Sequence, residues 1–315
     1  MMDFPVRSTI AVSEIGYFAR RWLTQVKEAT VLGNVTGGVY LLLSSQKVIF
    51  LSKGKFRGPL TLNLARHNEN LDELQIGTHA FVYPGKLYFP DLALGIRWEE
   101  ALIWRVSPPV KEPLPASDLF SNLKNLTQLV LDRRPSHQLA QFIPHLLGLQ
   151  QGCSTPNGEF FYLLENIKLA LQAQKSSLIA KALSEVLGKG SGLTPSGDDL
   201  CTGLILTFCR WGKIVMPSFR LEVLRHTVGK LDFGMTTTLG ANFIQLALKG
   251  QADERLILAL DGILCGDPDL SACADYLLSW GHSSGLDALT GIALALSFDN
   301  SFPQQSQIEK DRHQP

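Results

Sequence analysis

The stretch SPPVKEPLPAS, residues 107–117, separates two parts of the chain that differ in periodicity. Its four prolines lack a backbone N–H group, and each disfavours the helical conformation in the residue before it. Neither a helix nor a central strand is expected to continue through such a stretch. We therefore expect a domain boundary here, between a β-rich domain of residues 1–112 and a helical domain of residues 113–300.

On the N-terminal side of this boundary, short apolar runs alternate with turn residues. The runs are rich in β-branched and aromatic residues, as in KVIFLS (47–52), HAFVYPGKLYFP (79–90) and ALIWRV (101–106). This pattern predicts a mostly antiparallel sheet. Ahead of it, SEIGYFARRWLTQV (13–26) has apolar residues at helical spacing, which predicts one helix packed on the sheet.

On the C-terminal side, the spacing of apolar residues becomes helical. Runs of this kind recur from residue 117 to residue 298, for example SSLIAKALSEVL (176–187) and LSACADYLLSW (270–280). The two patterns together predict an α+β protein whose second domain is mainly helical. The polar tail of residues 301–315 buries little, and we expect it to be disordered.

The composition excludes several classes of partner. Lys plus Arg equals Asp plus Glu at 29 each, so no overall charge attracts nucleic acid or anionic lipid. The N-terminus lacks the apolar core of a secretion signal, and no apolar run reaches the roughly 20 residues that span a bilayer. We expect a cytoplasmic protein without a nucleic-acid or membrane partner.

The stretch GKGSGLTPSGDDLCTG, residues 188–203, places glycines ahead of a predicted helix start. A helix start has unpaired N–H groups and partial positive charge, and glycines let a phosphate or carboxylate approach closely. We therefore expect this stretch to bind a small anionic ligand. Its candidate ligand-binding residues are Gly190, Gly192, Thr194, Ser196 and Gly197.

The same stretch ends in two adjacent carboxylates, Asp198 and Asp199. Asp199 lies three residues after Ser196, as in a short-armed capping box, so a purely structural role is one interpretation. Adjacent carboxylates repel each other, and a cation such as Mg²⁺, or an amide group of a ligand, would offset that repulsion. Catalysis, metal binding and helix capping all stay open for the pair.

A second stretch, GHSSGLDALTG (281–291), repeats the pattern S-G-x-D-x-x-T-G of residues 196–203. An internal duplication would place two helix starts across one cleft, whereas coincidence is the alternative. Leu286 stands where the first copy has Asp198. The second copy adds Ser284, Gly285 and Asp287 as candidate ligand-binding residues.

The same segment contains His282, which is either a polar contact or a catalytic base. It also matches G-x-S-x-G, the nucleophile motif of serine hydrolases, centred on Ser283. That motif requires a preceding strand, and the run before it is predicted to be a helix. A serine hydrolase is therefore disfavoured.

Four weaker candidates, in three segments, complete the predicted site. Thr236 and Thr237 precede another predicted helix, where hydroxyls either cap the helix or contact an oxyanion. Asn34 lies in NVTGG and Arg57 in KGKFRG, two segments that are either hairpin turns or part of a ligand-closing surface.

The strings GLTPSGDDLCTG and GHSSGLDALTG, with the paired threonines and the β-rich N-terminal part, resemble the DUF family that contains AllH, a subunit of bacterial oxamate carbamoyltransferase. The resemblance runs over roughly residues 10–298. At position 240 the resemblance implies a serine, but this chain has Gly240. The resemblance implies a role in allantoin degradation, in which oxalurate and phosphate give oxamate and carbamoyl phosphate.

We therefore expect a subunit of, or an enzyme related to, a carbamoyltransferase that acts on a small anionic carbamoyl compound. Other carbamoyltransferase subunits are expected partners, and Mg²⁺ is a possible cofactor. Two alternatives stay open: a non-catalytic docking subunit, and a Mg²⁺-dependent helical hydrolase.

Overall fold

The computed structural model describes residues 7–66, 71–135, 137, 139–149 and 158–298. The chain forms two compact units, residues 1–106 and residues 107–315. The domain boundary expected between residues 112 and 113 stays a prediction, and the tail of residues 301–315 lies outside the described part.

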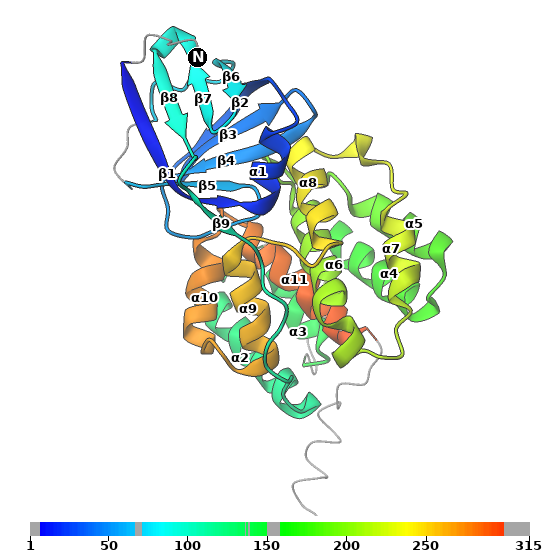
Figure 1. Ribbon diagram of the computed structural model, residues 1–315. Coiled ribbons are helices and arrows are strands. Elements are labelled where there is room, and N and C mark those ends of the chain that lie inside the picture. Colours follow the sequence, from blue (N-terminus) through cyan, green and yellow to red (C-terminus); the bar gives the residue numbers. More distant parts are fainter. Residues whose placement is uncertain (1–6, 67–70, 136, 138, 150–157, 299–315) are drawn as a thin grey trace, which may run out of the picture. The chain divides into compact units, whose positions relative to one another are not determined.

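The first unit is a closed barrel (Figure 1). Its strands follow the order β5-β4-β3-β2-β6-β7-β8-β1-β9, and an additional pairing of β1 with β5 closes strands β1 to β8 into a ring. Most neighbours are antiparallel, which confirms the predicted sheet type. The strands are β1 (Ser8–Gly16), β2 (Glu28–Val35), β3 (Gly38–Leu43), β4 (Lys47–Ser52), β5 (Thr61–Leu64), β6 (His79–Tyr83), β7 (Lys86–Phe89), β8 (Leu94–Arg97) and β9 (Leu102–Trp104).

The helix predicted at residues 13–26 is longer than the observed helix at both ends, by four residues before it and three after it. Residues 13–16 belong to β1, and the helix α1 (Tyr17–Leu23) begins only at residue 17. Glu14 and Ile15 pair with β5 on one side and with β9 on the other. The hydrogen bonds of these two ladders override the local helical spacing of the apolar residues.

The second unit is helical, and this confirms the α+β class predicted from the sequence. Its helices are α2 (Ala116–Arg133), α3 (Ile143–Leu146), α4 (Glu159–Ala173), α5 (Ser176–Val186), α6 (Ser196–Val215), α7 (Leu221–Val228), α8 (Thr238–Ala247), α9 (Glu254–Cys265), α10 (Leu270–Ser279) and α11 (Ser284–Ser297). Within the described ranges, none of the helices is long and apolar enough to cross a membrane.

Helices α6 and α11 form the centre of the helical unit (Figure 1). Residues 285–297 of α11 are all buried. The two helices touch through glycines: a Cβ atom on Gly203 would lie 2.0 Å from the carbonyl oxygen of Ala288, and one on Gly291 would lie 2.0 Å from that of Leu200. Only glycine permits so close an approach.

The two glycines that make these contacts occupy equivalent positions of the repeated motif. Gly203 and Gly291 occupy the last place of S-G-x-D-x-x-T-G, and each packs against the residue that follows the aspartate of the other copy. The motifs therefore meet with local two-fold symmetry, as an internal duplication would produce.

Alanine at either crossing glycine should destabilise the helical unit. Gly203→Ala and Gly291→Ala would each force the helices apart, at a cost of about 1–3 kcal/mol in the free energy of unfolding. Gly212→Ala is the matched control on α6, because its Cβ would meet only the Phe208 side chain, at 3.6 Å. We expect it to be neutral or stabilising. Urea denaturation measures all three, and equal midpoints for G203A and G212A would contradict the close crossing.

Candidate functional site

The two central helices begin in the same way. Helix α6 starts at Ser196 after Pro195, and α11 starts at Ser284 after Ser283. The loop before α6 needs glycine at Gly188, where φ is +73° and a Cβ would lie 1.9 Å from the carbonyl oxygen of Met235. Gly190, with φ of +107°, folds back against the backbone nitrogen of Ser196. The glycine-rich stretch thus turns tightly onto the helix start.

Backbone groups already occupy most N–H donors at both helix starts. Gly197 N–H donates to the Lys189 carbonyl at 2.9 Å, and Gly285 N–H to that of Trp280 at 3.1 Å. The next two N–H groups of each helix donate to the carbonyls of Pro195 and Ser283. A ligand at these helix starts would therefore meet side chains rather than the backbone cradle that the glycines suggested.

Helix capping does not account for the aspartates of the motif. In the described part of the chain, no side-chain hydrogen bond caps α6 or α11. Two other aspartates of the helical unit do cap their helices. Asp253 accepts from Arg255 N–H at the start of α9, and Asp269 accepts from Ala272 N–H at the start of α10. Asp199 and Asp287 differ from both, so the capping-box interpretation of Asp199 is wrong.

Asp198 connects three segments of the helical unit. One carboxylate oxygen accepts from Gly188 N–H at 2.9 Å, and the other accepts from the Thr236 hydroxyl. Burial raises the pKa of Asp198, and these two hydrogen bonds partly offset the rise. A Cβ on Gly240 would lie 2.1 Å from the Asp198 carboxylate. Glycine, where the family resemblance implies serine, leaves room for this carboxylate.

Thr237 acts as the N-cap of α8. Its hydroxyl accepts from Gly240 N–H at 3.0 Å and donates to the Leu193 carbonyl at 2.6 Å. Together with Asp198, it links the start of α8 to the glycine-rich loop. Both predicted threonines, Thr236 and Thr237, therefore lie beside the motif and hold it in place.

Asp199 and Asp287 are the unusual pair. Both residues are 0% exposed, and all four carboxylate oxygens lack a hydrogen-bond partner among the described residues. The hydroxyls of Ser284 and Thr194 lie near enough to lower the pKa of Asp199, and those of Ser196 and Ser283 do the same for Asp287, but none meets hydrogen-bond geometry. Buried unpaired carboxylates are costly and call for an explanation.

The pair strongly disfavours ionisation in the folded chain. Burial raises the pKa of Asp199 well above its ordinary value, and the charge of Asp287 raises it further. Burial likewise raises the pKa of Asp287 to about 7. Asp199 of α6 also lies near the Ser284 hydroxyl of α11, so the two carboxyls come from different helices and are close enough for their charges to interact.

His137 completes the surroundings of Asp287. Its Nε2 atom lies 3.6 Å from a carboxylate oxygen of Asp287, and its Nδ1 atom accepts from Ala140 N–H at 3.2 Å. Burial lowers the pKa of His137. Because the imidazole pKa falls while the carboxyl pKa rises, the contact favours neutral partners over an ion pair. A lone histidine after a run of polar residues gave no sequence signal for this role.

The other predicted residues have contacts of a different kind. His282 is exposed in the turn before α11, where its carbonyl accepts from Arg134 at 3.2 Å. Gly192 is exposed in the loop before α6. In the barrel unit, the Asn34 amide donates to the Leu74 carbonyl at 2.9 Å, and Arg57 pairs with Glu14 at 3.5 Å. A ligand contact by Asn34 or Arg57 stays a prediction.

The described residues contain no group of three or more His, Cys, Asp or Glu side chains placed to hold a metal ion. Asp198 and Asp199 contact different neighbours, as adjacent residues of a helix do. Magnesium binding by this pair stays a prediction.

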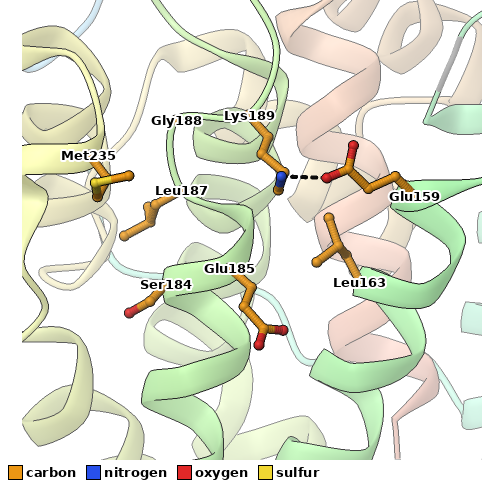
Figure 2. Close-up of a pocket in the computed structure, with 8 residues that line it drawn as sticks. All are labelled: Glu159, Leu163, Ser184, Glu185, Leu187, Gly188, Lys189 and Met235. Carbon is orange, nitrogen blue, oxygen red and sulfur yellow. Dashed lines mark hydrogen bonds and ion pairs between the residues drawn. The ribbon is translucent and has the colours of Figure 1, made fainter.

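A separate pocket of about 550 Å³ lies between α4, α5 and the turn at Met235 (Figure 2). Its charged residues are Glu159, Glu185 and Lys189, and Lys189 pairs with Glu159. This excess of carboxylates does not favour an anion. The pocket adjoins the motif through Gly188, whose N–H donates to Asp198, and through Lys189, whose carbonyl accepts from Gly197 N–H.

Asp287 should make stability depend on pH. The pKa of Asp287 in the folded chain, about 7, exceeds its ordinary value of 3.8. The contribution of Asp287 to the free energy of unfolding is therefore largest below about pH 4, where the carboxyl is protonated in both states, and it is lost as pH rises through about 7. The raised pKa of Asp199 acts in the same direction, whereas the lowered pKa of His137 reduces stability as pH falls below about 6.5. The Asp287 effect is at most on the order of 4 kcal/mol.

Asp287→Asn tests this dependence. Compared with the unaltered chain, we expect a similar urea midpoint near pH 5 and a higher one near pH 8, because asparagine has no charge to bury. His137 is present in both chains, so its contribution largely cancels. A variant that loses stability at high pH as steeply as the parent chain would refute the raised pKa.

Comparison with known proteins bears on this region. No solved structure matches the chain. Residues 186–296 match the family described as oxamate carbamoyltransferase subunit AllH. The matched stretch runs from the end of α5 into α11, so it contains both aspartate motifs and α8. Over residues 186–296 the chain is thus similar to the AllH family, which confirms the resemblance inferred from its two motifs.

Proposed function

We propose that this chain is a subunit of, or an enzyme related to, oxamate carbamoyltransferase, and that it acts on a small anionic carbamoyl compound. The observation that carries the proposal is the coincidence of two features in one stretch. The residues that match the AllH family contain two buried aspartates that have no hydrogen-bond partner in the described part of the chain, and neither caps its helix.

The chemistry of the cluster suits a carbamoyl group. A carboxyl group accepts a hydrogen bond from an NH₂ group whether or not it is protonated. The half-buried hydroxyls of Thr194, Ser196, Ser283 and Ser284 can donate to a carbonyl or carboxylate oxygen. We assign ligand contact to Asp199 and Asp287. Asp198, which already has two partners, is assigned a positioning role.

Carbamoyl transfer to phosphate requires little covalent chemistry from the protein. A phosphate oxygen attacks the carbamoyl carbon of oxalurate, the bond from that carbon to the oxamate nitrogen breaks, and this nitrogen takes up a proton. Positioning of the two reactants and stabilisation of the developing charge account for much of the acceleration in reactions of this kind. The rigid crossing of α6 and α11 provides such positioning.

A docking subunit without catalytic activity is the second candidate. Tyr162 and Leu169 lie seven positions apart on α4 and are 62% and 60% exposed. Residues at this spacing share one face of a helix, and exposed apolar faces are typical of subunit contacts. Under this alternative, other carbamoyltransferase subunits supply the ligand contacts.

A thermal-shift screen separates the two candidates. The purified chain is heated with Mg²⁺, phosphate, carbamoyl phosphate, oxamate or oxalurate at millimolar concentrations. If the chain contacts the ligand, at least one carbamoyl compound should raise the melting temperature, because binding to the folded state alone stabilises it. Asp199→Asn should abolish the shift, and Asp269→Asn, at a capping position, should retain it. No shift with any compound would favour the docking subunit.

A further inference from the structure

We infer that the pocket between α4, α5 and the turn at Met235 binds a small amphipathic amine, that is, a primary ammonium group on a short apolar stem. The pocket is separate from the buried aspartates to which the proposed function assigns ligand contact, so the inference goes beyond that function. It is carried by the volume of the pocket, by its apolar walls and by the sign of the charges at its edge.

The pocket has apolar side chains on opposite walls. Figure 2 shows Leu163 of α4 on one side, Met235 on the other and Leu187 between them. Leu163 and Leu187 are 8% and 5% exposed, whereas Met235 is 73% exposed. The volume of about 550 Å³ is typical of sites for small molecules. A stem of a few carbon atoms can bury its surface here, and the flexible Met235 thioether can adapt to its shape.

The charged groups at the edge of the pocket favour a cation. Glu159 and Glu185 contribute two carboxylates, and Lys189 contributes one ammonium group, which pairs with Glu159. Glu185 pairs at 4.0 Å with Lys181, one turn earlier on α5, whose side chain is 76% exposed. Such an exposed ion pair contributes little. Glu185 can therefore exchange this lysine for the ammonium group of a ligand, whereas an anion would be repelled by both carboxylates.

One wall of the pocket carries the groups that hold Asp198 in place. Gly188 lines the pocket, and its N–H donates to Asp198 at 2.9 Å. Met235 also lines the pocket, and the next residue, Thr236, donates to the other carboxylate oxygen of Asp198. A Cβ on Gly188 would lie 1.9 Å from the Met235 carbonyl oxygen, so the two segments are in backbone contact. The Gly188 amide is therefore a reporter of binding at this wall.

Two matched ligands test the preference for a cation. Hexylamine and 1-hexanol have the same apolar stem, and only the amine carries a charge. An NMR titration of the ¹⁵N-labelled full chain at neutral pH, followed at the amides of Gly188 and Met235, measures both affinities. We expect both amide signals to shift with hexylamine. We expect 1-hexanol to bind at least about fivefold more weakly, because only the amine is attracted by the carboxylates. Equal affinities, or no shift at either amide, would overturn the inference.

Variants locate the binding. Glu185→Gln removes one carboxylate and should weaken hexylamine binding about threefold or more, with 1-hexanol binding unchanged. Ser184 lies in the pocket wall and is exposed, so Ser184→Trp should block the pocket to both ligands. Glu222→Gln, at an exposed glutamate of α7 outside the pocket, is the matched control and should bind as the unaltered chain does.

Circular dichroism checks that each variant is folded, and the comparison of ligands in the unaltered chain decides the question if one is not. Hexylamine binding that stays unchanged in folded Glu185→Gln and Ser184→Trp would place the amine elsewhere and overturn the inference.

The result is independent of the proposed function. If hexylamine binds in the pocket and no carbamoyl compound raises the melting temperature, the amine site stands and the role in carbamoyl transfer loses its support. If a carbamoyl compound binds and hexylamine shifts neither amide, the amine site fails and the proposed function stands.

Discussion

The contact of two glycines with two carbonyl groups, where α6 crosses α11, is the constraint on which the helical unit depends. Gly203 and Gly291 bring the helix backbones closer than any side chain permits. Because the two motifs start a few residues before these glycines, the same crossing brings both helix starts together. Close packing of the backbones thus sets the distance between Asp199 and Asp287.

That proximity has an energetic cost. Two carboxyls are removed from water and have no hydrogen-bond partner among the residues that the structure describes, and burial raises their pKa values. A chain selected for stability alone would carry apolar or amide side chains at these positions. Groups that lower the stability of the folded chain commonly occur at sites of binding or catalysis. The cost of burying this pair is therefore itself an argument for function.

The segments around the pair hold it rigidly. Asp198 joins the end of α5 to the start of α8, and Thr237 joins α8 to the glycine-rich loop. Backbone carbonyls occupy the first N–H groups of both helices, so a ligand at this place would contact side chains. This division explains why two adjacent aspartates in one motif have different roles. Neighbouring positions on a helix point in directions about 100° apart.

The sequence by itself determined the fold class, the sheet type and the location of the matched motifs, because periodicity and turn residues act over a few neighbouring positions. It left the start of α1 wrong, since the pairing of β1 with β5 and β9 is set by distant residues. It also left catalysis, metal binding and helix capping open for Asp198 and Asp199 alike. Only the tertiary structure showed that Asp198 has partners, and that Asp199 lies near the Ser284 hydroxyl and close enough to Asp287 for their charges to interact. Hydrogen bonds and burial between segments nearly 90 residues apart leave no local pattern in the chain.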